Sequence, residues 1–471
     1  MTSAPDESYN ILHIGFDDTD SVKCRCTTHL AFKIVDYLLN IHTAFIDYPL
    51  LIRLNPNVPW KTRGNGAICL RIKTKNDQRI VEYVKQAIEH SSETGAGANP
   101  AVAFLNGEQV PDALKELSRI AMFDTISVYD AEKIALQNYI DYYTFGNGQG
   151  LVGSLAAIGS LLLADHTFEV IAYRKMENCG TTREVDKSKL RQYSKDTFPD
   201  TFNNFDEKKR RVLIAPHGPD PVFCGIRGEN PEVVIKSLKQ LQIQEELEGY
   251  MVFRSNQGTN MHLQNELNLK ELKVFSSGYI QCKVSKKPRS VLGGHVLFEV
   301  QDENGSTSSA AIYEPTGLTN VASRLEPGDT IEIGCSVRAS SSKFPTILNI
   351  EYILVLRLNE IYNLSNPLCE HCGKRMKSEG RNKGFQCEKC GFKDIAGKKK
   401  YEIQKRNISR GLYVPIPSAH RHLTKPIQRY GMEKGVFCIP FQLNLTSGWF
   451  YSLCETNHDV AGSPWLSMLK K

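Results

Sequence analysis

The chain has 471 residues, of which 41% are hydrophobic and 23% are charged, values typical of a globular protein and not of a disordered chain. At about 150 residues per domain, this length predicts roughly three domains. The longest uncharged apolar run, residues 150–164, is too short to span a bilayer, and the polar N-terminus does not resemble a signal peptide, so we expect a cytoplasmic protein. The 13 cysteines are an odd number and lie mostly in apolar segments, which excludes a secreted disulfide framework.

The first half of the chain alternates predicted strands and helices. Short apolar stretches predict the strands, and apolar residues at a spacing of three and four predict the helices. The expected strands cover residues 9–16, 41–54 and 67–73, and the expected helices cover residues 28–39 and 78–89. This alternation is typical of an α/β or α+β fold.

Three aspartates, Asp17, Asp18 and Asp20, follow the first predicted strand and are the best catalytic candidates in the chain. Three carboxylates within four residues repel one another unless a cation neutralises them, and Mg²⁺ shared with phosphate oxygens is the usual cation. In a purely structural interpretation, Asp20 or Ser21 would cap a helix. The spacing also fits the start of the haloacid-dehalogenase phosphatase motif, but no second Asp-Asp pair follows to complete that site.

The loop between the second and third predicted strands, residues 55–66, ends in two cations and two glycines. Lys61 and Arg63, together with Gly64, Asn65 and Gly66, would allow side chains and backbone N–H groups to wrap phosphate oxygens. The segment is not a Walker A motif, and taken alone it is equally compatible with an ordinary turn.

Residues 148–153 satisfy the G-x-G-x-x-G pattern of dinucleotide-binding proteins. The strand predicted before them is short, and no acidic residue ends the next strand, residues 168–173, where a ribose ligand would lie. We therefore expect a glycine-rich helix start that packs closely on a sheet.

Residues 211–228 predict a strand followed by an irregular loop with three prolines. The loop carries His217, Asp220 and Arg227. A rigid loop of this kind often shapes a site, although a structural turn is the alternative.

Beyond residue 272 the pattern changes to short strands without helical periodicity. Five strand-like segments cover residues 278–284, 295–301, 309–314, 330–337 and 348–356. Five strands in about 85 residues match the size and strand number of the OB-fold, a barrel that binds nucleic acids. An unrelated small barrel or sandwich is the alternative.

Two Cys-x-x-Cys pairs follow, separated by fourteen residues: Cys369 with Cys372, and Cys387 with Cys390. Four thiolates on two tight turns close a tetrahedral site with no open position, so the pattern predicts a structural Zn²⁺ in a zinc ribbon. Iron is the alternative, because thiolate-only sites also bind it.

The basic charge of the chain is concentrated around these cysteines. Residues 369–429 contain 16 Lys or Arg and 5 Asp or Glu, although the whole chain has a net charge of only +6. Such an excess attracts polyanions by counterion release, so we expect nucleic acid here, with a solvated lysine-rich surface as the alternative. The expected RNA contacts are Lys374, Arg375, Lys377, Arg381, Lys383, His420, Arg421, His422, Lys425 and Arg429.

Several longer segments together resemble one known family, the archaeal 2-agmatinylcytidine synthetases, which modify the minor isoleucine tRNA with a CAU anticodon. The shared segments are residues 14–21, 26–28, 55–66, 150–159, 214–229, the four-cysteine ribbon and residues 418–426. The resemblance implies an α+β multidomain protein with a kinase-like α/β catalytic domain, a ferredoxin-like domain, an OB-fold β-barrel and a C-terminal zinc ribbon. The corresponding ranges are 9–145, 146–268, 272–358, 366–432 for the basic ribbon and tRNA-binding region, and 433–471 for a C-terminal segment. In this family the first two domains can interleave in sequence.

The resemblance also implies an ATP-dependent ligase. ATP would activate the wobble cytidine by phosphorylating its carbonyl group, and agmatine would then displace the phosphate. Mg²⁺ at the three aspartates and the cations of the 55–66 loop would serve the phosphoryl transfer. The family's autophosphorylated threonine falls on Thr27, with Thr28 as the alternative. For the agmatine or base pocket we expect, from polarity and position, Asp124, His217, Asp220 and Glu229.

Two departures from the family pattern touch none of these roles: Phe16 stands at an aliphatic position, and the chain starts with eight extra polar residues. The remaining alternative is a non-catalytic tRNA-binding protein with a structural Mg²⁺ site. The substitution Asp18→Ala separates the two hypotheses, because only the ligase loses ATP consumption while it keeps its tRNA affinity.

Overall fold

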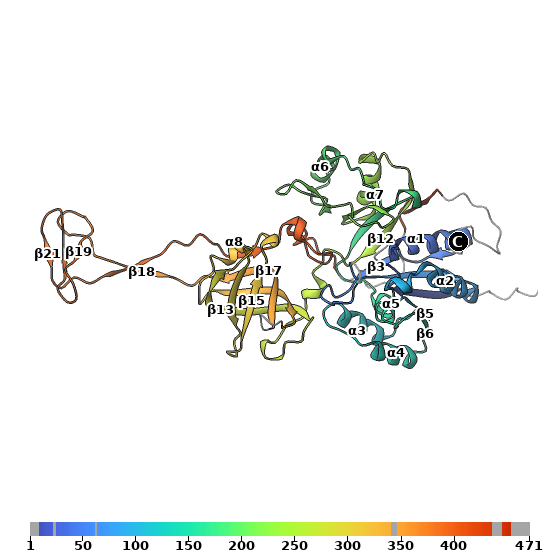
Figure 1. Cartoon of the computed structure of the whole chain (residues 1–471), viewed down its shortest axis with the longest axis horizontal. Coiled ribbons are helices and arrows are strands. Elements are labelled where there is room, and N and C mark those ends of the chain that lie inside the picture. The colour runs from blue at the N-terminus through green and yellow to red at the C-terminus, as the bar shows by residue number, and fades with distance from the viewer. Residues whose placement is uncertain (1–8, 22–24, 62–63, 341–345, 436–444, 454–471) are drawn as a thin grey trace, which may run out of the picture.

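The computed structural model describes residues 9–21, 25–61, 64–340, 346–435 and 445–453. They form three parts along the long axis of the molecule: a main body built on one large sheet, a β-barrel, and a small tip at the end of a two-stranded stalk (Figure 1). Within these ranges, no helix is both long and apolar enough to cross a membrane.

The sheet of the main body has eleven strands in the described chain. Its order is β6-β5-β1-β4-β3-β12-β7-β11-β8, with β2 beside β4 and β24 beside β12. The parallel pair β3 and β12 joins the strands of the first half to those of the second. The bounds are β1 Asn10–Asp17, β2 Ala44–Phe45, β3 Leu50–Arg53, β4 Gly66–Thr74, β5 Ala101–Asn106, β6 Asp141–Thr144, β7 Thr167–Arg174, β8 Thr201–Phe202, β11 Val222–Gly228, β12 Leu247–Ser255 and β24 Phe450–Ser452.

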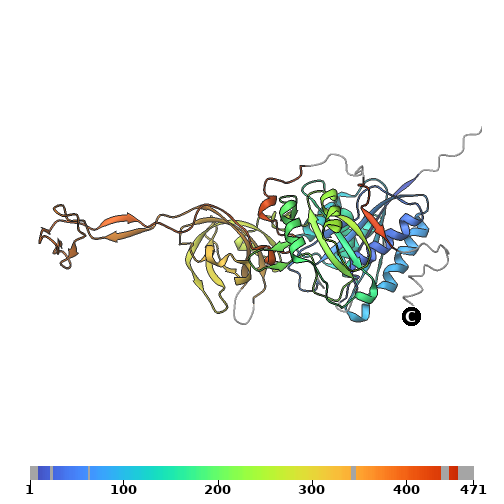
Figure 2. The ribbon, with the colours of Figure 1, turned by 90° about the horizontal axis from the view of Figure 1, so that it is seen from above.

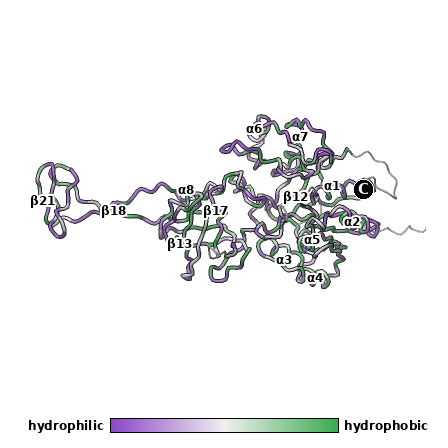
Figure 3. The backbone as a smooth tube through the Cα atoms, in the orientation of Figure 1, coloured by the Kyte–Doolittle hydropathy of each residue, from purple (hydrophilic) through white to green (hydrophobic). Residues whose placement is uncertain are grey.

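Helices cover both faces of the first half of the sheet. Alternate residues of a strand lie on opposite faces, and Leu12, Ile14 and Phe16 of β1 therefore enter one core together with α1 and α2. The other face packs against α5, a strongly hydrophobic helix (Figure 3), with α3 and α4 in the same core. Helices α6 and α7 belong to the core of the second half. The bounds are α1 Thr27–Asn40, α2 Asp77–Ser91, α3 Asp112–Ala121, α4 Val128–Gln137, α5 Gly150–Gly159, α6 Lys187–Asp196 and α7 Pro231–Gln240.

The strand expected over residues 41–54 is interrupted in the structure. Strands β2 and β3 are separated by a bend that ends at Pro49. Proline has no N–H to donate to a ladder, so the chain cannot pair continuously through it. The expected strands around β1 and β4 and the expected helices around α1 and α2 are confirmed.

The predicted five-stranded barrel is confirmed. Its strands run in the order β15-β14-β13-β16-β17, and a parallel pairing of β15 with β17 closes the barrel. Its interior is lined by alternate apolar residues of all five strands. The bounds are β13 Ser277–Ser290, β14 Val296–Gln301, β15 Thr307–Ile312, β16 Thr330–Arg338 and β17 Ile347–Arg357, with the short helix α8 Thr319–Ala322 before β16.

The tip is inserted after the barrel. The chain leaves along β18 (Tyr362–Ser365) and returns along β22 (Lys400–Ile403), which pairs with β18 (Figures 1 and 2). Between them, the tip contains β19 (Lys377–Ser378), β20 (Phe385–Gln386) and β21 (Lys393–Asp394). It then adds β23 (Gly411–Tyr413) to the barrel and continues onto the main body. The exact division into domains remains a prediction.

Candidate active site

A cavity of about 400 Å³ lies where β1 ends, α1 begins and the loop between β3 and β4 approaches the sheet. Strands β7 and β11, with the loop before β11, supply the rest of its wall. The cavity brings together most of the candidates from the first half of the chain. Those that line it are Asp17, Asp18, Asp20, Thr27, Thr28, Lys61, Gly64, Asn65, Gly66, Asp124 and Asp220.

Strand β1 delivers the three aspartates to this cavity. Asp17 is its last residue, and Asp18 turns the chain with a left-handed backbone (φ 56°). The carboxylate of Asp17 accepts a hydrogen bond from the backbone N–H of Asp18 (2.7 Å), and the Asp18 carboxylate accepts one from the backbone N–H of Asn99 (3.1 Å). This tight turn places the carboxylates of Asp17, Asp18 and Asp20 in one wall.

The surroundings of the aspartates disfavour their charged forms. Burial raises the pKa of Asp17 well above its usual value, and the neighbouring Asp18 raises it further. Burial also raises the pKa of Asp18 to about 7, with Asp20 as the second cause. Neighbouring carboxylates repel one another when charged, and a cation bound between them would favour their charged forms.

Helix α1 starts in the wall of the same cavity. Cys26, Thr27 and Thr28 line it, and the Thr19 hydroxyl donates a hydrogen bond to the Thr27 hydroxyl (3.1 Å). The first turn of α1 has no acidic residue, and the side chain of its N-cap residue, Cys26, makes no capping hydrogen bond within the described part of the chain. Its backbone N–H groups and the helix dipole therefore favour an anion at this point.

The predicted phosphate loop also lines the cavity, whereas Arg63 lies outside the described residues. Gly64 permits a close approach, because a Cβ atom there would lie 2.6 Å from Arg53 Nη1 and 2.8 Å from His422 Nε2. Burial and the neighbouring Arg421 lower the pKa of Lys61. The loop thus rests on a half-buried arginine and a half-buried histidine.

Arg53, at the end of β3, is a cation of this cavity that the sequence analysis did not identify. Burial lowers its pKa to about 10, so the guanidinium remains charged at neutral pH. Its Nε atom is buried and has no hydrogen-bond partner among the described residues. A charged guanidinium with an unused donor favours a phosphate or carboxylate ligand.

A polar network surrounds His422 in the wall next to Arg53. Arg227 Nε (3.1 Å) and Gln257 Nε2 both donate hydrogen bonds to the carboxylate of Glu169. His422 Nδ1 lies 3.0 Å from Arg227 Nη2 and 2.9 Å from Gln257 Oε1, so it accepts from the arginine or donates to the glutamine, but not both. Burial, together with Arg53 and Arg227, lowers the pKa of His422 far below its usual value, which keeps the imidazole neutral.

Glu169 and Arg227 were also missed as a pair by the sequence analysis. They are directly opposite each other on β7 and β11, with apolar residues beside them along each strand. The sequence did contain a signal for this pair, because a charged residue within an apolar strand segment requires a partner of opposite charge when the strand is buried.

The four residues expected in the agmatine or base pocket separate into two groups. Asp124 and Asp220 line the cavity. His217 lies on the exposed part of the loop, where its Nε2 accepts a hydrogen bond from Arg211 (2.7 Å). Glu229 is paired with Arg429 and is not part of the cavity wall.

The candidate tRNA contacts after residue 419 lie on the main body and not on the tip. His420 bonds to Asn203 (3.0 Å), and His422 is in the cavity wall. Arg421 bonds to Asn57 of the main body and to Glu351 of barrel strand β17 (3.3 Å). This segment therefore connects the barrel to the cavity.

Two of these assignments must be corrected. Arg429 is fully buried, and its guanidinium pairs with Glu229 and with Asp165 (2.8 Å). Lys425 is 6% exposed and pairs with Glu433. The basic composition predicted phosphate contacts for both, but a buried and paired cation cannot reach a phosphate at the surface.

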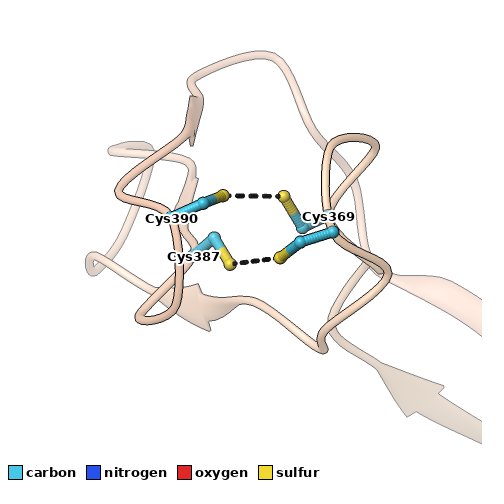
Figure 4. Close-up of side chains that lie close together, drawn as sticks. Cys369, Cys387 and Cys390 are labelled. Carbon is cyan, nitrogen blue, oxygen red and sulfur yellow. Dashed lines mark hydrogen bonds between the residues drawn. The ribbon is translucent and has the colours of Figure 1, made fainter.

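The four cysteines of the tip lie at one point (Figure 4). Cys369 Sγ is 3.5 Å from Cys390 Sγ, and Cys372 Sγ is 3.4 Å from Cys387 Sγ, with all four sulfurs within 4.8 Å of one another. Ligands at about 2.3 Å around a tetrahedral Zn²⁺ would have sulfurs roughly 3.8 Å apart, so the four thiols fit this ion. Every cysteine in the described ranges is a free thiol.

The candidate cations between the two cysteine pairs are on the surface of the tip. Lys374 and Lys377 lie beside Glu388, and Arg375 pairs with Glu402 (3.2 Å). All five are exposed: Lys374, Arg375, Lys377, Arg381 and Lys383. They are accessible to a polyanion.

Family comparisons agree with this architecture. The TiaS TCKD domain matches residues 13–96, the TiaS FLD domain matches residues 148–262, and the TiaS C-terminal zinc ribbon domain matches residues 366–408.

Curated relatives match over nearly the whole chain. The isoleucine-tRNA 2-agmatinylcytidine synthetase TiaS of Cenarchaeum symbiosum is 41% identical over 420 residues, which cover 89% of this chain and 93% of the relative. The protein of the same name from Methanosarcina mazei is 39% identical over 427 residues, which cover 88% of this chain and 97% of the relative.

Solved structures are similar to the same extent. The crystal structure of TiaS in complex with its isoleucine tRNA and ATP has a TM-score of 0.79 and 33% identity, with 89% of this chain and 97% of that chain covered. A complex of TiaS with the same tRNA, AMPCPP and agmatine has a TM-score of 0.77 and 31% identity, with the same shares covered.

Proposed function

This chain belongs to the TiaS family of isoleucine-tRNA 2-agmatinylcytidine synthetases, and from that premise we propose how its residues carry out the family's reaction. The protein is an ATP-dependent ligase that joins agmatine to the wobble cytidine of the isoleucine tRNA with a CAU anticodon, so that the anticodon reads AUA. One observation carries the residue assignment: a single cavity holds an acidic cluster, a helix N-terminus, a glycine-containing loop and a half-buried arginine.

The reaction requires activation because the carbonyl oxygen of cytidine is a poor leaving group. In the first step, a phosphoryl group moves from ATP to this oxygen, and the bond from phosphorus to the bridging oxygen of ATP breaks. In the second step, the amine nitrogen of agmatine bonds to the carbon that carries this oxygen. Phosphate leaves with the electron pair of the carbon–oxygen bond, and the nitrogen that has bonded to the carbon loses a proton. The protein has to position three reactants and stabilise negative charge.

We assign the phosphates of ATP to the loop at Gly64 to Gly66, with Lys61 and the half-buried Arg53 as cations. The N-terminus of α1 adds backbone N–H donors in the same wall. Asp17, Asp18 and Asp20 would hold Mg²⁺, which when bound neutralises charge that develops on the phosphates. Thr27 stands at this helix start, where a phosphoryl group could reach its hydroxyl.

We assign the guanidinium of agmatine to Asp124 or Asp220, because both carboxylates line the cavity and a guanidinium prefers a carboxylate partner. Arg183 supports the loop that carries Asp220 by donating to the carbonyls of Pro216 (3.0 Å) and Gly218 (3.0 Å). The loop is therefore rigid enough to position one substrate.

We assign tRNA binding to the barrel and to the exposed cations of the tip. Together they would hold the tRNA while the target base leaves its stack and enters the cavity. A cytoplasmic location fits this substrate.

Nucleoside mass spectrometry tests the proposal. A CAU-anticodon isoleucine tRNA transcript is incubated with the protein, ATP, Mg²⁺ and agmatine, and each component is omitted in turn. We expect the wobble cytidine to gain the mass of agmatine less water only in the complete mixture. Tight tRNA binding without any such product would instead support the non-catalytic alternative.

A further inference from the structure

The two-stranded stalk between the barrel and the tip has two chemically different faces. Residues directly opposite each other in an antiparallel pair lie on the same face. The register pairs Tyr362 with Ile403 and Leu364 with Tyr401, and the alternate positions carry Asn363 opposite Glu402 and Ser365 opposite Lys400. We call the side with Tyr362, Leu364, Tyr401 and Ile403 the apolar face of the stalk.

The apolar face is open to solvent. The exposed fractions are 50% for Tyr362, 55% for Leu364, 72% for Tyr401 and 63% for Ile403. Alternation of apolar and polar residues along a strand normally marks a face that packs on a core, but here the strands run alone between barrel and tip (Figure 2). A face of this composition is expected to have a binding partner.

The two tyrosines, which we call the tyrosine platform, meet edge to face across the stalk. Their rings are 6.2 Å apart at an angle of 85°, and they belong to different strands. Aromatic side chains held on a β-surface are the usual means by which proteins stack unpaired bases, and every base has a face that can stack.

Lysines outnumber carboxylates around the stalk and favour a polyanion, with Glu360, which accepts a hydrogen bond from the Tyr362 hydroxyl, as the acidic residue beside the platform. Lys398, Lys399, Lys400 and Lys405 lie in or next to β22. The acidic residue of β22, Glu402, is paired with Arg375 (3.2 Å). A second copy of the chain would bring the same positive charges to this face, and four side chains are few beside the roughly 20 to 30 residues that each partner contributes to a standard protein interface.

We propose that the apolar face of the stalk stacks unpaired nucleotides of the tRNA substrate. The proposal rests on the proposed function and adds a surface to it: the stalk is itself a binding element and not only a spacer for the tip. The lysines beside it contact the phosphates, and Tyr362 and Tyr401 contact the bases.

The test compares two double variants of the full-length protein. Tyr362→Ala with Tyr401→Ala removes the platform, and Asn363→Ala with Ser365→Ala is the matched control on the other face of the same strands. Fluorescence anisotropy gives the Kd for a CAU-anticodon isoleucine tRNA at two salt concentrations, and zinc content reports an intact tip. A third variant, Tyr401→Trp, keeps an aromatic ring.

We expect the platform variant to bind tRNA about 5- to 150-fold more weakly, the value of one stacked base. The salt dependence should stay unchanged because no charge is removed, and both the control variant and Tyr401→Trp should bind like the wild type. Equal affinity of the platform and control variants overturns the inference and leaves the proposed function intact. Light scattering gives the second outcome that would overturn the inference. If the wild type has the mass of two chains and the platform variant the mass of one, the apolar face joins two copies of the chain. Failure of the wild type to bind this tRNA would count against the proposed function itself.

Discussion

Asp18 combines a charge with an unusual backbone conformation. Its left-handed φ of 56° is one that asparagine adopts as readily as aspartate, and the N–H of Asn99 holds its carboxylate. The substitution Asp18→Asn therefore keeps the shape of the turn and removes a negative charge from the proposed metal site.

We expect Asp18→Asn to lower ATP consumption by on the order of 100- to 1000-fold, because a group that holds charge in place for phosphoryl transfer is lost. The tRNA affinity should remain that of the wild type. Coupled ATPase assays and anisotropy measure the two quantities, with the exposed Asp141→Asn as a control. If ATP consumption and tRNA affinity fell by the same factor, the substitution would have unfolded the turn instead of removing only a charge.

His13 on β1 is a second buried group whose pKa is shifted. Its Nδ1 faces Arg71 Nη1 (2.5 Å) and its Nε2 faces the carbonyl of Gly107 (2.9 Å). Burial, followed by the charge of Arg71, lowers its pKa from 6.5 to about 3. The folded protein therefore keeps this histidine neutral at pH values where the unfolded chain protonates it.

Stability should consequently fall as pH drops below 6.5 toward 3, since the unfolded state binds the additional proton. One such group contributes a slope of about 1.4 kcal/mol per pH unit in this window. Urea unfolding at pH 7, 6 and 5 should show a shallower dependence for His13→Gln than for the wild type. The exposed His217→Gln is the control, and parallel curves for His13→Gln and the wild type would contradict the assignment.

The aspartates could be predicted from sequence because they are neighbours in the chain. The association of Arg53, Glu169 and Arg227 could not be predicted, because they lie far apart in the sequence and only the order β3-β12-β7-β11 brings them together. Arg429 was assigned to tRNA binding from the basic composition of its segment. Composition does not show that Arg429 is buried in ion pairs with Asp165 and Glu229.

At the scale of single elements, α5 determines how close the helix layer lies to the aspartates. The expected glycine-rich helix start is observed, and a Cβ atom at Gly153 would lie 1.8 Å from Asp17 Oδ2. A Cβ at Gly159, the other end of the same helix, would instead lie 2.0 Å from the carbonyl oxygen of Leu114 in α3. Both glycines therefore allow α5 to pack closely, Gly153 against Asp17 and Gly159 against the backbone of α3.

Gly153→Ala should therefore displace the Asp17 carboxylate and lower ATP consumption by about tenfold or more, because a shift near 1 Å disturbs positioned groups. Gly159→Ala should lower the melting temperature but leave ATP consumption per folded molecule nearly unchanged. Steady-state kinetics with thermal unfolding distinguishes the two variants. Similar kinetics for both would contradict a specific role of Gly153.

Among the elements, the barrel strands were predicted best, because strands such as β16 alternate apolar and polar residues. The segment after β23 was predicted least well. It has almost no regular structure, and individual polar contacts such as Arg421 with Glu351 hold it in place. Such contacts leave no periodic pattern.

At the scale of the whole molecule, the tip is separated from the cavity by the barrel and the stalk (Figure 1). The base of the stalk is fixed by Arg406, which pairs with the buried Asp329 of the barrel and donates to the carbonyl of Arg324 (2.8 Å). The tip beyond it depends on its own small core and its four thiols.

Loss of zinc should therefore unfold the tip alone. For Cys387→Ser we expect no bound zinc and tRNA affinity reduced by about tenfold or more near physiological salt, because the five exposed cations lose their arrangement. The melting temperature of the main body should not change. Metal analysis, anisotropy and calorimetry measure the zinc content, the tRNA affinity and the melting temperature. A lower melting temperature of the main body in Cys387→Ser would contradict the independent folding of the tip.

Strand β24 has a consequence for how the protein is made. Phe450–Ser452 pairs with β12, and the Phe450 ring stacks on Phe32 of α1 at 5.2 Å. During synthesis, the ribosome therefore releases the barrel and the tip before the segment that completes the main body. Until then the edge of β12 and the side of α1 stay uncovered on the nascent chain, a state prone to wrong pairing. A translational pause within the tip would prolong that state, although every residue of the cavity up to Arg227 had already been synthesised.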